Sequence, residues 1–197
     1  MPILRIELRL EELNVEEWGE LFPIEMKNYN SNWSSIFEFE KKLIENKLGN
    51  ETVHRIEHFG STSIPNLKAK DIVDILIEIP NHLLFDESII NKMMDLGYQF
   101  FRQPGFGIDY MIFVKGFHTD GKKSQKFFAH MTIGNHPELW DRIYFRDYLK
   151  LNPTVIRKYE KLKCKLAKKY SKNRIEYRIG KTEFVKEITE VAKKARL

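Results

Sequence analysis

The chain has 197 residues, 42% of them hydrophobic and 13% aromatic, which suits one globular domain with a sizeable core. No apolar run approaches the roughly 20 residues that a membrane-spanning helix needs. Charged residues alternate with apolar ones between Arg5 and Glu12, which argues against a signal peptide. We therefore expect a cytoplasmic protein without a membrane segment.

The net charge of +5 is concentrated between Arg157 and Arg196. Six lysines in this region are predicted to form the solvated side of an amphipathic helix: Lys158, Lys161, Lys163, Lys165, Lys168 and Lys169. A nucleic-acid-binding surface is the less favoured interpretation of the same pattern. The single cysteine, Cys164, excludes an intrachain disulfide and a zinc site of clustered cysteines, so we expect a structural or surface thiol.

The N-terminal part of the chain is predicted to contain a strand followed by a helix. Residues 3–18 alternate loosely between charged and apolar side chains, which favours a short strand. Residues 31–48 carry apolar side chains at helical spacing. Ser31 and Asn32 are candidate caps for this helix, and Gly49 is expected to end it.

Five further strands are predicted after this helix. They cover residues 53–59, 72–79, 98–102, 110–115 and 125–133. A helix over residues 86–96 separates the second of these strands from the third, and a polar turn at residues 119–123 joins the last two. The second strand is almost uninterruptedly apolar, as is typical of a strand buried on both faces of a sheet.

The C-terminal third is predicted to be helical. Pro137 and Pro153 each stand where the first turn of a helix is expected, and a last helix is predicted to begin near Thr182. The expected fold class is therefore α/β (α+β), a mixed β-sheet flanked by helices with a helical C-terminal segment. The expected parts are an N-terminal extension over residues 1–23, an α/β domain over 24–135 and a helical segment over 136–197 packed on the same domain.

The run Gly60-Ser61-Thr62-Ser63 lies between two predicted strands. Glycine lets a backbone approach a phosphate closely, and backbone N–H groups and hydroxyls beside it can donate hydrogen bonds to the phosphate. Taken alone, such a run more often forms an ordinary turn. Its neighbourhood favours a binding site, because Asp74 follows inside an apolar strand.

Asp74 needs a partner, because burying a carboxylate is costly unless it is paired or binds a cation. A metal ion, a lysine such as Lys70, or a backbone donor would each serve.

Four segments of the chain match sequence motifs of one known family. They are residues 29–33 with Phe37 and Glu40, residues 56–65, Lys70 with residues 74–76, and residues 145–149. On these motifs the chain resembles the GrpB family of proteins from about residue 24 to residue 188.

This resemblance implies a fold of the nucleotidyltransferase superfamily. In that superfamily a Gly-Ser turn holds nucleotide phosphates, acids on neighbouring strands bind magnesium, and a hydroxyl or phosphate attacks the α-phosphate of a nucleoside triphosphate. Transferred to this sequence, the resemblance implies magnesium bound by Asp74, and catalytic roles for Asp74 and His130. The implied phosphate-binding residues are Gly60, Ser61, Thr62, Ser63, Lys70 and Arg146.

The sequence departs from this pattern at the second acid. Active superfamily members carry two acids two residues apart on one strand, but the residue two positions after Asp74 is Leu76. Glu78 shares the face of Asp74 but lies about 13 Å further along a regular strand. An acid from elsewhere, such as Asp109 or Glu57, could complete the site; on sequence alone the pair is missing.

Two further candidates have alternative interpretations. His130 could hydrogen-bond Asp74 or a ligand, or be a partly buried histidine satisfied by backbone. Arg142 and Arg146 share one helix face that could meet a triphosphate. The favoured alternative is that Arg146 and Asp147 fix their helix to the sheet through ion pairs.

Three functions follow from these observations. The first is a magnesium-dependent nucleotidyltransferase, or a protein that binds a nucleotide or phosphorylated small molecule. The second is a non-catalytic ligand-binding or interaction module that kept the fold and lost the second acid. The third is a nucleic-acid-binding protein that uses the basic C-terminal helices.

Overall fold

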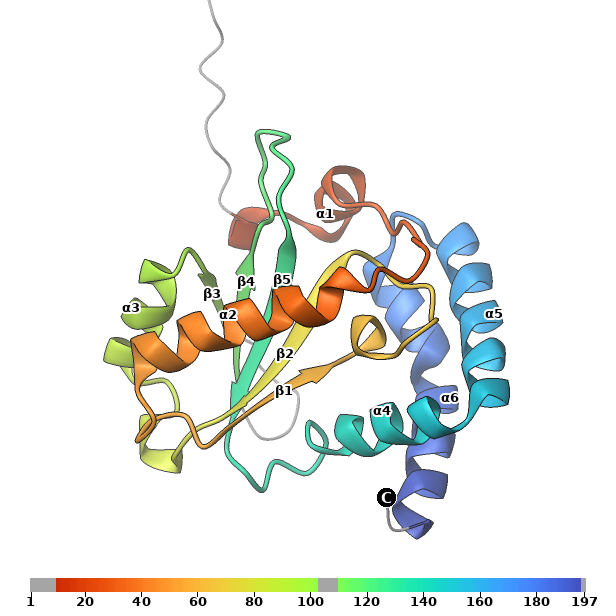
Figure 1. The fold of residues 1–197 in the computed structure, drawn as a ribbon. Helices are drawn as coiled ribbons and strands as arrows, with labels where there is room; N and C mark the ends of the chain where they lie inside the picture. Colours follow the sequence, from red (N-terminus) through yellow and green to blue (C-terminus); the bar gives the residue numbers. More distant parts are fainter. Residues whose placement is uncertain (1–9, 103–109, 196–197) are drawn as a thin grey trace, which may run out of the picture.

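The computed structural model of the protein describes residues 10–102 and 110–195. Its centre is a five-stranded sheet with the order β1-β2-β5-β4-β3 (Figure 1). The strands are β1 (Arg55–Phe59), β2 (Ile72–Glu78), β3 (Gln99–Arg102), β4 (Met111–Lys115) and β5 (Lys126–Thr132). Strands β2 and β5 are parallel, and the other neighbouring pairs are antiparallel. The predicted mixed sheet is therefore confirmed.

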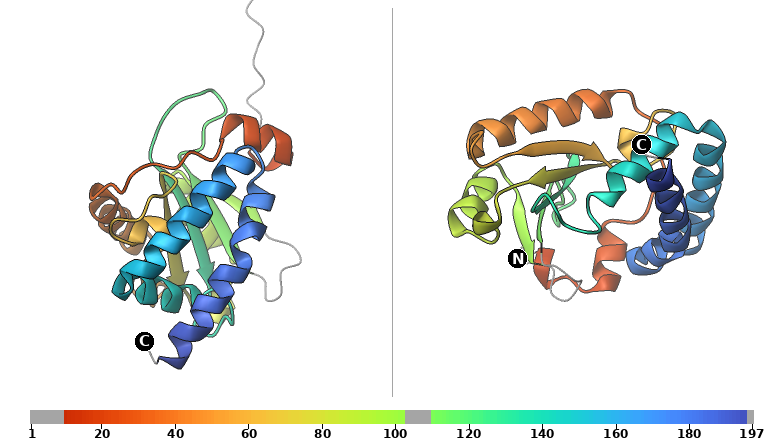
Figure 2. Two further views of the ribbon diagram at one scale, coloured as in Figure 1. Left: turned by 90° about the vertical axis from the view of Figure 1, so that its right-hand side faces the viewer. Right: turned by 90° about the horizontal axis from the view of Figure 1, so that it is seen from below.

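Helices cover both faces of this sheet. They are α1 (Val15–Leu21), α2 (Asn32–Leu48), α3 (Glu87–Asp95), α4 (Asp141–Leu151), α5 (Pro153–Lys169) and α6 (Arg174–Lys194). Helix α2 lies on one side of the sheet and α1 on the opposite side, while α4, α5 and α6 gather at the end away from α3 (Figures 1 and 2). The expected fold class, including the helical C-terminal segment, is confirmed.

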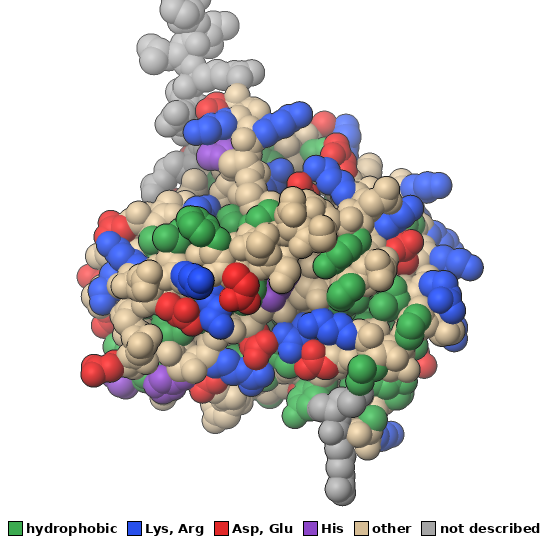
Figure 3. Space-filling view, viewed as in Figure 1, with side chains coloured by type: hydrophobic (Ala, Val, Ile, Leu, Met, Phe, Trp, Pro, Cys, Tyr) green, Lys and Arg blue, Asp and Glu red, His purple; other side chains and the backbone are tan. Residues whose placement is uncertain are grey.

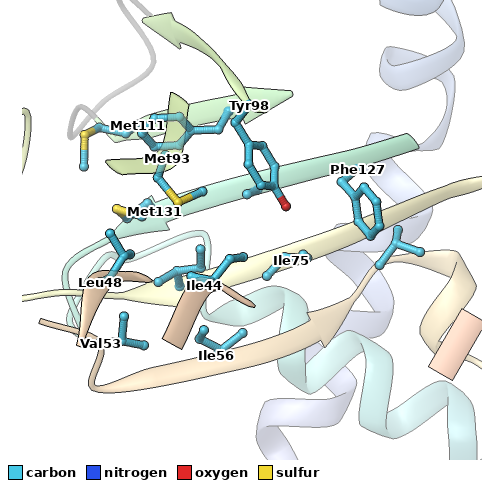
Figure 4. Packing of buried hydrophobic residues seen from close by; sticks show 14 of the residues in the cluster. Ile44, Leu48, Val53, Ile56, Ile75, Met93, Tyr98, Met111, Phe127 and Met131 are labelled. Atoms are coloured by element: carbon cyan, nitrogen blue, oxygen red, sulfur yellow. The ribbon is translucent and has the colours of Figure 1, made fainter. Parts of the chain in front are cut away.

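The larger hydrophobic core lies between the sheet and the helices α2 and α3. Ile75 of β2 is fully buried there, with Ile44 of α2 and Met93 of α3 (Figure 4). Trp33 is also fully buried, and its indole N–H donates to Asp71 Oδ1 at 2.8 Å. This bond anchors the start of α2 to the residue just before β2.

A second core covers the opposite face of the sheet. Ile72 and Leu76 of β2 pack there with Phe59 of β1. Phe22, directly after α1, and Ile143 of α4 pack against them from the helices. Strand β2 is thus buried on both faces, as its apolar run predicted.

The N-terminal strand prediction is not supported where the structure describes the chain. Residues 3–9 lie outside the described residues, and from Leu10 the chain forms a 3-10 turn and then α1. Asn14 accepts hydrogen bonds from the amides of Glu16 and Glu17, and the Glu17 carboxylate accepts from the Asn14 amide at 2.8 Å. This capping box starts a helix, and it outweighs the loose alternation that favoured a strand.

The C-terminal helices pack against the turn between β1 and β2. Ile64 and Leu67 of this connection are buried against Phe145, Leu149 and Tyr159 of α4 and α5. Helix α6 begins at Arg174, earlier than the predicted start near Thr182, because Asn173 caps it by accepting from the Glu176 amide. No helix in the described ranges has both the length and the hydropathy needed to cross a membrane.

We expect Gly19→Ala to destabilise the protein by about 1–3 kcal/mol, because there is no room for a side chain at this position. A Cβ on Gly19 would lie 2.7 Å from the carbonyl carbon of Lys172 and closer still to its oxygen. Urea denaturation would measure the change. The matched control is Val15→Ala, an exposed position on the same helix that should change stability by less than about 0.5 kcal/mol. Equal stabilities of the two variants would contradict this packing.

Candidate functional site

The turn after β1 brings Gly60 against Asp74. Gly60 has φ +72°, in the left-handed region that favours glycine. A Cβ at this position would lie 2.8 Å from the Cγ of Asp74 and closer still to its Oδ2. Because Phe59 pairs with Asp74 in the β1–β2 register, the turn begins beside the carboxylate. The structure therefore brings together two residues that the sequence singled out.

The hydroxyls of the turn have different environments. Ser63 Oγ donates to the Gly60 carbonyl at 2.7 Å. Thr62 is buried, and its Oγ1 donates to the Ile72 carbonyl at 3.2 Å, so this side chain ties the turn to the start of β2. Ser61 is half-buried and lies near the hydroxyl of Tyr159 from α5. Thr62 thus has a structural contact, while Ser61 faces the helical layer.

Apolar side chains surround Asp74 within the sheet. Its cross-strand neighbours are Phe59 on β1 and Phe128 on β5, and Ile72 and Leu76 flank it on the same face of β2. In the described parts of the chain, no group of three or more His, Cys, Asp or Glu side chains is placed to hold a metal ion.

The acids named in the sequence as possible partners, Glu57 and Asp109, and the neighbouring Asp71 have contacts of their own or lie outside the described residues. Glu57 is 2.6 Å from Arg146 Nη1 and 2.9 Å from Arg55. Asp71 accepts from Trp33, and Asp109 lies outside the described residues. Two metal ions about 3.5–4 Å apart need bridging carboxylates, and the described residues around Asp74 do not fit such a site.

The charged groups that act on the Asp74 carboxylate are cations. Burial raises its pKa, and four positive side chains act against that rise: Lys70, Arg142, Lys181 and Lys163. No nitrogen of the described cations lies within 4.0 Å of an Asp74 carboxylate oxygen, the distance of an ion pair. The charges of these cations nevertheless lower the pKa of Asp74 from further away. The charges of these four side chains therefore act on the carboxylate without forming a direct ion pair with it.

These cations come from separate elements. Lys70 precedes β2, Arg142 lies on α4, Lys163 on α5 and Lys181 on α6. The Nζ of Lys181 lies 4.5 Å from the ring centroid of Tyr177, and the Nζ of Lys70 lies 5.5 Å from it. The fold of the C-terminal helices therefore assembles the cluster.

The lysines of the cluster hold their protons weakly. Burial lowers the pKa of Lys70 to about 7, and the neighbouring charges of Arg174 and Lys181 lower it in the same direction. Burial also lowers the pKa of Lys163 to about 7 and that of Lys181 to about 8. Burial is the largest cause for each lysine, and neighbouring positive charges lower the pKa further.

Lys163 does not lie on the solvated side of its helix, where the sequence pattern predicted it. It is 1% exposed; its Nζ donates to the Lys68 carbonyl and lies 5.0 Å from the Tyr159 ring centroid. A signal was present in the sequence. Lys163 follows Tyr159 by four residues and precedes Leu166 by three, so it lies on the apolar face of α5.

His130 lies in an aromatic environment on the same face of the sheet. Its ring centroid is 5.2 Å from that of Phe59 and 5.7 Å from that of Tyr110. Burial, with the nearby charge of Arg142, holds its pKa well below the ordinary value. Its Nδ1 has no hydrogen-bond partner among the described residues. A neutral His130 is therefore expected, and its catalytic role stays a prediction.

Arg146 joins α4 to β1 beside the turn. Its guanidinium donates to Glu57 at 2.6 Å, to the His58 carbonyl at 2.9 Å and to Asp147 at 2.7 Å. This is the structural arrangement favoured from the sequence. With three protein acceptors, Arg146 is less suited to a phosphate contact than the lysines around Asp74.

Two open hollows on the surface are lined by other residues. One runs along α1, and the other lies between Met26 and Cys164 and borders the cluster at Lys68, whose carbonyl accepts from Lys163. The cluster around Asp74 is half-buried instead, between the sheet and the C-terminal helices.

Comparison with known proteins places these features in a family context. Residues 23–191 match the family model described as GrpB protein, so the family resemblance is confirmed. The Glutamate-rich protein GrpB of Alkalihalophilus pseudofirmus is 34% identical over 162 residues, 81% of this chain and 90% of that protein. The UPF0157 protein YqkA of Bacillus subtilis is 32% identical over 88% of this chain, which spans 49% of that protein's length.

A solved structure agrees with the family match. The crystal structure of the conserved protein GrpB from Enterococcus faecalis matches with a TM-score of 0.74 and 27% identity, over 87% of this chain and 99% of that chain. A structure of the Cid1 poly(U) polymerase matches 72% of this chain and 44% of that one with a TM-score of 0.48 and 10% identity. This last likeness is too weak to carry any argument about chemistry.

We expect Gly60→Ala to destabilise the protein by about 1–3 kcal/mol, because the new Cβ meets Asp74 and the backbone has a positive φ. Part of this loss should be recovered in the background of Asp74→Ala, which removes the carboxylate that the Cβ meets. A double-mutant cycle by urea denaturation would measure the coupling, expected to exceed about 0.5 kcal/mol. Additive single effects would show that the two residues do not meet.

Lys70→Met should stabilise the protein near neutral pH, because it removes a buried cation. The folded-state pKa of Lys70 is about 7 and the ordinary value is 10.5. The charged lysine therefore lowers the free energy of unfolding by its full penalty below about pH 7. This penalty disappears as the pH rises toward 10.5. The gain in the free energy of unfolding should therefore be largest near pH 6.5 and shrink toward pH 10.

The exposed Lys165→Met provides the matched control for this pH series, with an expected change below about 0.5 kcal/mol at each pH. Denaturant titrations at several pH values would make the comparison. A Lys70→Met protein that is less stable than the unmodified protein at pH 6.5 would show that the cation is fully compensated in the folded state.

Proposed function

The chain belongs to the GrpB family, and from the geometry beside Gly60 we propose that it binds a nucleotide or another phosphorylated small molecule. The observation that carries this proposal is the convergence of Lys70, Arg142, Lys163 and Lys181 on one half-buried carboxylate. Positive charge of this density, partly removed from water, favours an anionic ligand.

The energetics support a ligand rather than a purely structural role. Each pKa unit by which a lysine is lowered corresponds to about 1.4 kcal/mol of lost preference for its charged form. A structural network would pair such cations directly, as Arg146 is paired with Glu57. The cations around Asp74 lack such pairs among the described residues, so a bound phosphate would stabilise them.

Binding is favoured over nucleotidyl transfer. The magnesium-dependent reaction implied by the family resemblance needs a set of acids that the described residues around Asp74 do not provide. We therefore propose a ligand-binding protein that retains the turn and the strand acid, and we assign no step of transfer to these residues.

Nucleic-acid binding is the weaker alternative. Exposed lysines of α5 line one edge of the molecule, but acidic and basic side chains are interspersed over the adjoining face (Figure 3). A strong affinity for nucleic acid would need a broader field of one sign.

Thermal-shift titration with ATP, CTP, GTP and UTP, each with and without magnesium, tests the proposed function. A ligand at a hundred times its dissociation constant stabilises by about 2.7 kcal/mol. For a chain of this size that corresponds to a rise in the melting temperature of roughly 5–10 °C. Lys181→Met should lose most of this rise, whereas the exposed Lys165→Met should keep it. If none of the four nucleotides raises the melting temperature, nucleotide binding at this site is wrong.

A further inference from the structure

We infer that the lysines beside Asp74 take the place of a metal, so that the site binds the polyphosphate chain of its ligand free of magnesium. The substrate class is an anion with several linked phosphates, such as a nucleoside triphosphate or inorganic triphosphate. This inference rests on the proposed function and goes further, because it names the charge state of the ligand and excludes a metal requirement.

The charge distribution around Asp74 disfavours a divalent cation. The side chains whose charges reach this carboxylate are Lys70, Arg142, Lys181 and Lys163. Each would repel a magnesium ion placed there, and Asp74 alone would attract it. In addition, the neighbours of Asp74 on its face of the sheet are apolar, so they offer no oxygen ligands.

The same distribution fits an extended anion. Arg174 adds a fifth positive charge beside Lys70, and burial lowers the pKa of this arginine to about 10. A single phosphate group carries about two negative charges at most and, together with Asp74, would leave about two of these five cations uncompensated. A triphosphate chain carries roughly twice that charge and would approximately balance them.

The cations are also positioned to surround a chain rather than to contact one point. They project from the segment before β2 and from α4, α5 and α6. The ring of Tyr159 lies beneath Lys163 and the ring of Tyr177 beneath Lys181, so each ammonium is held by packing on an aromatic face. Lys70, Arg142 and Lys181 can then each meet a different phosphate of one chain. Lys163 is 1% exposed and bound to the Lys68 carbonyl, so it adds its charge without touching the ligand.

Isothermal titration with inorganic triphosphate and with ATP tests this inference. One series contains EDTA, and the other contains magnesium in excess over the ligand at matched ionic strength. We expect binding in EDTA and an affinity at least tenfold weaker in magnesium, because the metal competes with the lysines for the phosphates. Orthophosphate should bind at least tenfold more weakly than triphosphate in EDTA.

Asp74→Asn separates the two kinds of site. If lysines hold the ligand, removing the carboxylate takes away a repulsive charge, and the affinity for triphosphate in EDTA should stay equal or increase. If Asp74 holds magnesium, the same variant should lose binding. Circular dichroism would establish that it is folded, and Lys181→Met, expected to lose at least tenfold in affinity, gives a second test that does not depend on Asp74.

The outcomes distinguish this inference from the proposed function. Binding that requires magnesium, and that is lost in Asp74→Asn, would overturn the inference while leaving the proposed function intact. Failure of triphosphate and nucleotides to bind in either series would overturn both.

Discussion

The close approach of Gly60 to Asp74 is the constraint on which the candidate site depends. A side chain at residue 60 has no room, because the Asp74 carboxylate fills the space where a Cβ would be. The turn can therefore fold back over the start of β2, where Thr62 binds the Ile72 carbonyl. This fold-back directs Ile64 and Leu67 into the core formed with α4 and α5. Because residue 60 has no side chain, the connection between β1 and β2 can pack against the helices that carry the cations.

The charges of the site follow from that packing. Two like unit charges about 8 Å apart repel by about 2 kcal/mol at an effective dielectric constant of about 20. The cations near Asp74 therefore disfavour their own assembly, and the carboxylate compensates only part of this. The buried contacts of Tyr159 and Tyr177 with the rest of the helical layer supply the stabilisation that holds them together. Proteins commonly carry such locally unfavourable arrangements at functional sites.

The sequence predicted the parts of this structure that depend on local pattern. The strands and the α2 and α3 helices lie close to the predicted ranges, because their apolar spacing, caps and turns agree with one another. The predicted N-terminal strand was wrong from Leu10 onward, because the capping box at Asn14 favours a helix more strongly than the weak alternation of charged and apolar residues favours a strand. Gly60 and Asp74 could be recognised from a motif. The convergence of Arg142, Lys163 and Lys181 could not, since these residues are distant in sequence and meet only through the packing of three helices.

The chemical difference between lysines and a metal gives the site its character. A magnesium ion brings its charge with the ligand and leaves with it, whereas lysines keep theirs in the empty site. Burial, and after it the neighbouring cations, lower the pKa values of Lys70 and Lys163 to about 7, so both lysines titrate near neutral pH. This makes the charge of the site adjustable, since the uptake of a proton by either lysine strengthens the attraction for an anion. If the site binds an anion as we propose, we expect the affinity to be highest on the acid side of neutrality and to be linked to proton uptake instead of to the concentration of a metal.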